Sequence, residues 1–216
     1  MNTELKNIAA AVAHDLNNYL QVVMGNLELL RRRREFAAEI VEMALGATRH
    51  SAALADRLLA LGRLEPEAVR DFDLNHFVQQ LTDSMAPTFG DGIRVELDLA
   101  ADLASAFADP RAVQLVLLEL VANARAAMPN GGRLLIRTAP GPDGLLVLEL
   151  SDSGAGMSAE ALARAQAPLL ARGERGKLGG LGLPIVEACM RQAGGRIELA
   201  SAPGAGTTVK LYIPRA

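Results

Sequence analysis

The feature that most constrains the fold is a long N-terminal stretch without proline. Residues 3–64 contain no proline and only three glycines, so little in this stretch would break a helix. Apolar side chains recur there every three or four residues, which is the period of an α-helix. The basic run at 31–34 separates two such series. They are Leu5, Ile8, Val12, Leu16, Tyr19, Val23, Leu27 and Leu30, followed by Ile40, Ala44, Ala47, Leu54, Leu58 and Leu61.

This pattern predicts two long helices joined by a short turn. A single helical hairpin cannot bury both of its faces, so we expect two copies to form a four-helix bundle. Residues 1–64 are therefore predicted to be a dimerisation hairpin, and the chain is predicted to be a homodimer. The charged, proline-containing segment 65–72 is interpreted as a linker, because the composition changes after it.

Residues 73–216 carry mixed helix and strand signals, so the fold class is α+β. Asp73 and Asp109 are typical N-caps, and Pro110 suits the first position of a helix. A further helix is expected over 181–195, where two glycines end it. Alternating residues predict strands at 93–99, 131–139 and 144–152, and a closing hairpin at 196–201 and 206–214.

Composition excludes several classes of protein. The single cysteine, Cys189, excludes an internal disulfide and fits a reducing compartment. A net charge of -3 gives no reason to expect nucleic-acid binding. No apolar run approaches the roughly 18 residues that span a bilayer, and the N-terminus lacks the order of a signal peptide. We therefore expect a soluble, cytoplasmic protein without direct membrane insertion.

The stretch "AVAHDLNNYL" at 11–20 places polar residues inside the first apolar series. At about 100° per residue, His14 and Asn18 fall at roughly 200° and 240° from Val12, on the face opposite the apolar stripe. Asp15 lies at the flank of that stripe. An exposed imidazole beside a carboxylate can act as a nucleophile, but the same pattern also fits a plain solvated face. This segment alone favours the solvated face.

A second group of motifs follows in the C-terminal part. Glu119 and Asn123 lie one helical turn apart in "ELVANA", and the amide oxygen of Asn123 suits Mg²⁺. A strand ends at Asp152 in "SDSGAGM", where the carboxylate can accept a hydrogen bond from an exocyclic amine. The glycine-rich "GKLGGLGL" opens a helix, where backbone N–H groups can approach an anion. Each motif is weak alone, and the chain has no P-loop.

Taken together and in this order, these motifs resemble those of the two-component sensor histidine kinases over essentially the whole chain. "AHDLNN" is similar to the H box, "LLELVANARAAMPNGG" to the N box, "DSGAGM" to the G1 box and "GGLGLPIVEACMRQAGGRIEL" to the G2 box. The resemblance implies an α/β sandwich ATP-binding domain over 73–216 behind the dimeric hairpin. It also implies the cofactors ATP and Mg²⁺ and a response-regulator receiver domain as partner.

The resemblance assigns a role to each matching residue. It implies His14 as the phosphoacceptor, Asp15 as its acidic neighbour, Asn18 for a reverse or hydrolytic step and Glu119 as a base. Asn123 would be the magnesium ligand. The implied nucleotide-binding residues are Asn123, Asp152, Gly154, Gly156, Lys177, Gly180, Leu181 and Gly182.

The lid between the G1 and G2 boxes departs from the family pattern. Gln166, Leu169 and Leu170 stand where phenylalanines are common, and Gly173 stands where a lysine is often found. Ala126 replaces a frequent aspartate in the N box. The chain is therefore either a kinase that phosphorylates His14 from ATP, or a histidine phosphotransferase with a degenerate pocket that relays phosphate between receivers. A dimeric scaffold without phosphoryl chemistry is the third alternative. The retained motif residues favour the kinase.

Overall fold

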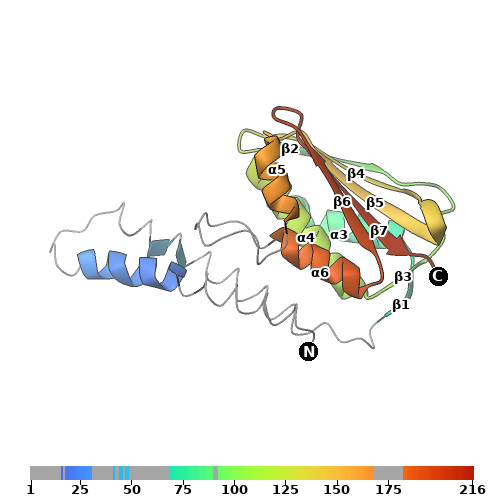
Figure 1. Cartoon of the computed structure of the whole chain (residues 1–216), viewed down its shortest axis with the longest axis horizontal. Helices are drawn as coiled ribbons and strands as arrows, with labels where there is room; N and C mark the ends of the chain where they lie inside the picture. Colours follow the sequence, from blue (N-terminus) through green and yellow to red (C-terminus); the bar gives the residue numbers. More distant parts are fainter. Residues whose placement is uncertain are drawn as a thin grey trace. The chain divides into compact units, whose positions relative to one another are not determined.

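The computed structural model describes residues 16, 18–30, 41, 44–45, 47–48, 69–89, 92–167 and 182–216. The chain forms two compact units, residues 1–64 and residues 65–216 (Figure 1). In the first unit, residues 18–30 are helical, and so is each described residue between 41 and 48. The helical prediction is thus confirmed for the described part of this unit.

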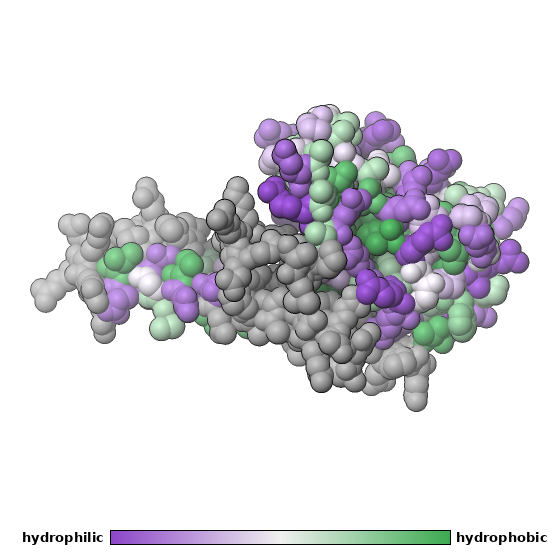
Figure 2. All heavy atoms as spheres, viewed as in Figure 1, coloured by the Kyte–Doolittle hydropathy of each residue, from purple (hydrophilic) through white to green (hydrophobic). Residues whose placement is uncertain are grey.

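The apolar series of the first helix divides into buried and exposed positions. Within that series Tyr19 is buried, whereas Leu27 is 55% exposed; Met24, which lies outside the series, is 70% exposed. Figure 2 shows hydrophobic side chains at the surface of this described helical part. Within one copy of the chain, part of the predicted stripe therefore remains accessible to solvent.

The second unit is built on a mixed five-stranded sheet (Figure 1). Strand β2 pairs in parallel with β4, and the remaining neighbours are antiparallel. Two short strands form a separate antiparallel ribbon, β1 (Arg70–Phe72) with β3 (Ala106–Ala108). The order across the sheet is β2 (Ile93–Asp98), β4 (Gly132–Pro140), β5 (Leu145–Asp152), β7 (Thr207–Pro214) and β6 (Arg196–Ser201).

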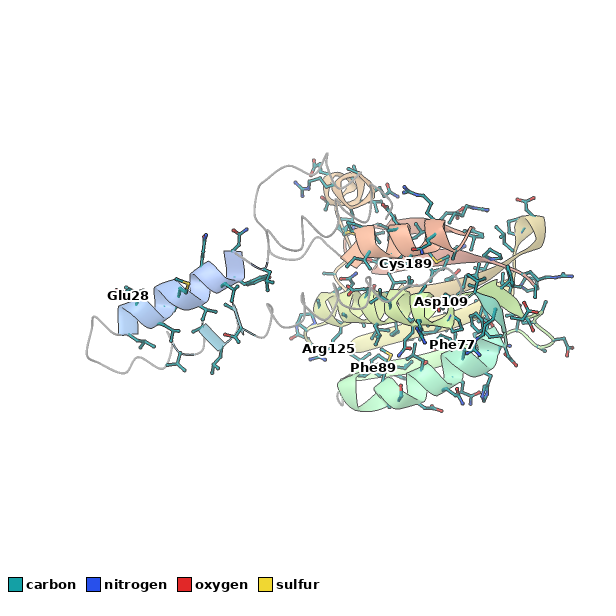
Figure 3. All side chains as sticks on the ribbon, turned by 90° about the horizontal axis from the view of Figure 1, so that it is seen from below. Glu28, Phe77, Phe89, Asp109, Arg125 and Cys189 are labelled. Carbon is teal, nitrogen blue, oxygen red and sulfur yellow. The ribbon has the colours of Figure 1, made fainter. Side chains whose placement is uncertain are left out.

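Three helices lie side by side on one face of this sheet: α3 (Leu74–Phe89), α4 (Pro110–Ala127) and α6 (Gly182–Gln192) (Figure 3). The predicted caps are confirmed. Asp73 Oδ1 accepts from the backbone N–H of His76 at 2.9 Å, and Asp109 Oδ1 accepts from that of Arg111 at 2.8 Å. Alternate strand residues are buried against the helices, among them Leu134, Ile136, Leu148, Leu150 and Leu211. The expected α/β sandwich is confirmed.

The other face of the sheet is polar. One row across the five strands alternates in charge and consists of Asp98, Arg137, Glu149, Lys210 and Glu198. Arg137 Nε lies 3.0 Å from Asp98 Oδ2, and Lys210 Nζ lies 3.5 Å from Glu149 Oε2. Because opposite charges face each other across neighbouring strands, this face suits water rather than a second apolar layer.

The strands and helices predicted between 73 and 216 are all present, with ends shifted by a few residues. Among the described residues, the short strands β1 and β3 and the helix α5 (Ala159–Gln166) were not predicted. Ser158 caps α5, accepting from the backbone N–H of Ala161 at 3.2 Å. No helix among the described residues is both long and apolar enough to cross a membrane.

Candidate functional site

A cavity of about 420 Å³ opens on the helix side of the sheet, where five segments meet. Such a volume lies within the range of pockets that hold a small organic ligand. Helix α4 contributes Leu120, Asn123, Ala124 and Ala127; β5 and the loop after it contribute Asp152, Gly156 and Met157. The other walls come from Arg164 and Ala165 of α5, Leu183 of α6, and Leu199, Thr207 and Val209 of the closing hairpin. Residues from three of the predicted motifs therefore line one cavity.

Asp152 is anchored by the backbone around it. Its Oδ1 accepts from the N–H of Gly154 at 2.8 Å and from the N–H of Thr207 at 3.2 Å. These two bonds fix the carboxylate at the end of β5, beside the cavity. A carboxylate held in this way presents an acceptor in a fixed position, which suits recognition of a ligand amine.

The loop after β5 packs too closely against α4 for larger residues. A Cβ on Gly154 would lie 2.7 Å from the carbonyl oxygen of Ala127, and the N–H of Ala155 donates to that same oxygen at 3.1 Å. Gly156 has a φ of 66°, which favours glycine, and a Cβ there would collide with the carbonyl oxygen of Ala202. The glycines of the "SDSGAGM" motif thus bring the backbone close to α4 and to the closing hairpin.

Glu119 and Asn123 of α4 meet the start of α6. A Cβ on Gly182 would lie 2.9 Å from Glu119 Oε2 and 3.1 Å from Asn123 Nδ2. Glu119 is only 4% exposed, whereas Asn123 is exposed and lines the cavity. The first residue of α6 therefore lies directly against the side chains of Glu119 and Asn123.

Cys189 lies deeper in the same part of the molecule, on the side of α6 nearer to α4 (Figure 3). Burial raises the pKa of its thiol from 9.0 to about 12, and the negative charges of Glu119 and Asp109 add to that rise. A thiol with such a pKa stays protonated near neutral pH and is a poor nucleophile. This agrees with the interpretation of Cys189 as a small buried apolar residue.

Several predicted site residues cannot be placed. His14, Asp15, Lys177, Gly180 and Leu181 lie outside the described residues. Asn18 is described, and it is exposed on the first helix as expected. Within the described ranges, no group of three or more His, Cys, Asp or Glu side chains could hold a metal ion. A cation at Asn123 would accordingly need most of its ligands from water and from phosphate oxygens.

Sequence reasoning missed two polar residues of the cavity lining. Thr207 positions Asp152 through its backbone N–H, and Arg164, an exposed residue of α5, is one of the lining residues. A signal for Thr207 exists in the preceding Gly206, whose φ of 75° and close approach to Asp152 require glycine. No comparable local signal marks Arg164.

Residues 108–216 match the family model of histidine kinase-, DNA gyrase B- and HSP90-like ATPases. The chain belongs to this family. Residues 4–67 match the model of the His Kinase A (phospho-acceptor) domain. The two models together give the domain set of sensor histidine kinases, so the resemblance seen in the sequence is confirmed.

Two relatives are similar along nearly the whole chain. The sensor kinase CckA of Brucella abortus is 31% identical over 96% of this chain, and the histidine protein kinase DivJ of Caulobacter vibrioides is 32% identical over 95% of it. The matched part is only 24% of the length of CckA and 36% of the length of DivJ. The chain thus corresponds to a part of each relative.

Solved structures share the fold. The histidine kinase AdeS of Acinetobacter baumannii has a TM-score of 0.69 at 20% identity and matches 94% of this chain and 98% of its own. Full-length ShkA, solved in complex with AMPPNP, has a TM-score of 0.65 at 20% identity and matches 98% of this chain and 46% of its own. Membership of the ATPase family supports ATP binding by residues 108–216.

Proposed function

We propose that this chain is the kinase core of a two-component system, which phosphorylates His14 from ATP and passes the phosphoryl group to a receiver aspartate. The observation that carries the proposal is the 420 Å³ cavity, which Asn123 and Asp152 line together. The AMPPNP complex of the structural relative ShkA supports the same use of this fold. The proposed domains are the hairpin 1–64, the linker 65–72 and the ATP-binding domain 73–216.

The residues of the cavity fit a nucleotide. Asp152, fixed through Oδ1, would accept a hydrogen bond from the adenine amino group. Asn123 would hold Mg²⁺ through its amide oxygen, and the ion would neutralise phosphate charge. Gly182 at the start of α6 leaves room for phosphate beside Asn123, where a Cβ would intrude. Gly180, Leu181 and Lys177 are proposed to complete the phosphate contacts.

The proposed reaction is a direct transfer. An imidazole nitrogen of His14 attacks the γ-phosphorus, the bond from that phosphorus to the β,γ-bridging oxygen breaks, and ADP leaves. Asp15 orients the imidazole and accepts its proton, Glu119 serves as a base near the cation, and Asn18 acts in a reverse or hydrolytic step. The chain would contribute positioning and charge stabilisation.

Dimerisation through residues 1–64 is part of the proposal. On the helical stretch 18–30 the exposed apolar side chains are Leu20, Val22, Met24, Leu27 and Leu29. So many exposed apolar side chains on one helix are unusual unless another surface covers them. A second copy of the hairpin would cover those that face it, Leu27 of the predicted stripe among them, in a four-helix bundle.

The test is labelling of the purified chain with γ-labelled ATP and Mg²⁺, comparing the wild type with His14→Ala. We expect label on the wild type and none on His14→Ala. His76→Ala, which removes an exposed histidine of α3, is the matched control and should retain label. Calorimetry with ATP measures binding separately from transfer.

A histidine phosphotransferase is the second candidate, and the polar Gln166 at a position where the family is commonly aromatic favours it. The phosphotransferase function predicts that ATP gives no label and that calorimetry detects no heat of nucleotide binding. His14 would instead acquire label from a phosphorylated receiver. Absence of both kinds of label would exclude both functions and leave the scaffold.

A further inference from the structure

The charge of the cavity lining is unevenly distributed. Among the described residues that line it, Asp152 is the one acid and Arg164 is the one base; the others are apolar, or carry an amide or a hydroxyl. A nucleoside triphosphate brings several negative charges into this cavity. Without Arg164, the described lining would meet those charges with a carboxylate alone, which is unfavourable.

Arg164 belongs to the last turn of α5, and α5 is held against the edge strand β6. Ahead of the helix, the N–H of Met157 donates to Ser201 Oγ at 2.9 Å. At its end, Gln166 Nε2 donates to the carbonyl oxygen of Leu199 at 3.2 Å, and Leu199 is itself a lining residue. Attachment at both ends keeps the turn that carries Arg164 at the wall of the cavity.

We propose that Arg164 binds the phosphate groups of the nucleotide in this cavity. The inference rests on the proposed function, because it names a further phosphate-binding residue of the same site. A guanidinium can donate two parallel hydrogen bonds to phosphate oxygens, and its charge does not depend on pH in the physiological range. The competing explanation is structural: a basic residue in the last turn of a helix also stabilises that helix through its dipole.

The two explanations are separated by calorimetry of the full chain with ATP and with adenosine. For Arg164→Ala we expect binding of ATP to weaken by about tenfold, which corresponds to about 1.4 kcal/mol, while binding of adenosine is unchanged. Arg164→Lys keeps the positive charge but loses the planar guanidinium, so its affinity for ATP should lie between those of the wild type and Arg164→Ala. Arg111→Ala removes an exposed arginine of α4 that does not line the cavity, and it should bind both ligands like the wild type.

Each other outcome overturns the proposal in a recognisable way. Equal weakening for ATP and adenosine would show that Arg164 shapes the cavity and does not contact phosphate. Unchanged ATP binding, together with a lower melting temperature of Arg164→Ala, would leave only the helix-dipole role. A wild type that binds neither ligand would overturn the proposed function itself, whereas a wild type that binds ATP no better than Arg164→Ala would overturn this inference alone. Arg164→Lys keeps the test decisive should Arg164→Ala not fold.

Discussion

The two sides of the cavity differ in how firmly the fold holds them. On one side, α4, β5 and β7 are joined through Asp152, whose Oδ1 accepts from Gly154 and Thr207, and through the contact of Gly154 with Ala127. On the other side, none of the eight residues of α5 is buried. Two hydrogen bonds at its ends tie it to β6, the partly buried one from Met157 to Ser201 and the exposed one from Gln166 to Leu199.

This difference suggests a division of labour within the site. Binding groups held by buried backbone are preorganised, because their geometry is set when the domain folds. Groups on an exposed helix can adjust at small cost, because few packed contacts oppose the movement. We therefore infer that Asp152 at the end of β5 recognises the base, that Asn123 of α4 holds the cation, and that Arg164 on the α5 side adapts to the phosphates.

The largest effect is expected at Asp152, on the firm side. Asp152→Asn keeps an oxygen that can accept from Gly154 and Thr207, so the loop should retain its shape. It loses the charged acceptor for the adenine amine. Loss of one charge-assisted hydrogen bond, about 1.5–3 kcal/mol, weakens ATP binding by roughly ten- to 150-fold. Calorimetry with ATP measures the change.

The control for this substitution is the thermal unfolding of the same variant. A melting temperature within about 2 °C of the wild type would show that the domain is intact. If Asp152→Asn binds ATP as tightly as the wild type, the Asp152 carboxylate does not contribute to binding of the adenine amino group. Preorganisation of that side would then have only a structural role.

The sequence predicts the firmly held side of the site better than the α5 side. Helix α4 is readable because its signals are local: the Asp109 cap, Pro110 and the apolar turns that follow. Asp152, Gly154 and Gly156 are readable as a motif at a strand end. The bond from Thr207 to Asp152 joins residues 55 positions apart through the register of β5 and β7, and no local pattern encodes it.

The α5 side was harder to predict for a physical reason. A helix of eight residues is marginal by its own propensity and depends on tertiary contacts, here with β6. Its one strong local signal is the Ser158 cap. Arg164 lies on it without a motif of its own, so its place in the lining follows only from the fold.

The next largest effect is expected at Gly182, where the firm side meets α6. Gly182→Ala places a methyl group 2.9 Å from Glu119 Oε2 and 3.1 Å from Asn123 Nδ2, so these side chains must shift. Since alanine favours a helix, the free energy of unfolding should change by less than about 1 kcal/mol. We expect the rate of His14 labelling to fall by about tenfold, because small displacements of positioning groups are costly. A labelling time course with a parallel urea unfolding curve measures both quantities. Normal labelling by Gly182→Ala would mean that the contact with Glu119 and Asn123 does not govern transfer.

A smaller effect is expected on the adaptable side, at Gln166. Gln166→Ala removes an exposed hydrogen bond worth about 0.5–1 kcal/mol, so ATP affinity should fall by roughly two- to fivefold. Gln166→Glu has a similar shape but no hydrogen to donate to Leu199, and it should behave at least as poorly. Calorimetry of both variants provides the comparison. A loss as large as that of Asp152→Asn would contradict the view that the α5 side is loosely held.

The smallest effect at neutral pH is expected for Cys189, in the core behind the firm side. Because burial raises its pKa from 9.0 to about 12, the folded state keeps the thiol protonated where the unfolded chain ionises it. The stability that this thiol contributes is therefore complete below pH 9 and is lost as pH rises towards 12, by up to about 1.4 kcal/mol per pH unit. Urea unfolding at pH 8 and pH 10 should show a steeper loss for the wild type than for Cys189→Ala, since other groups titrate equally in both. At pH 8, iodoacetamide should modify Cys189 only after unfolding. Rapid modification of the native chain would show that α4 and α6 open readily, which would contradict the view that this side of the cavity is firmly held.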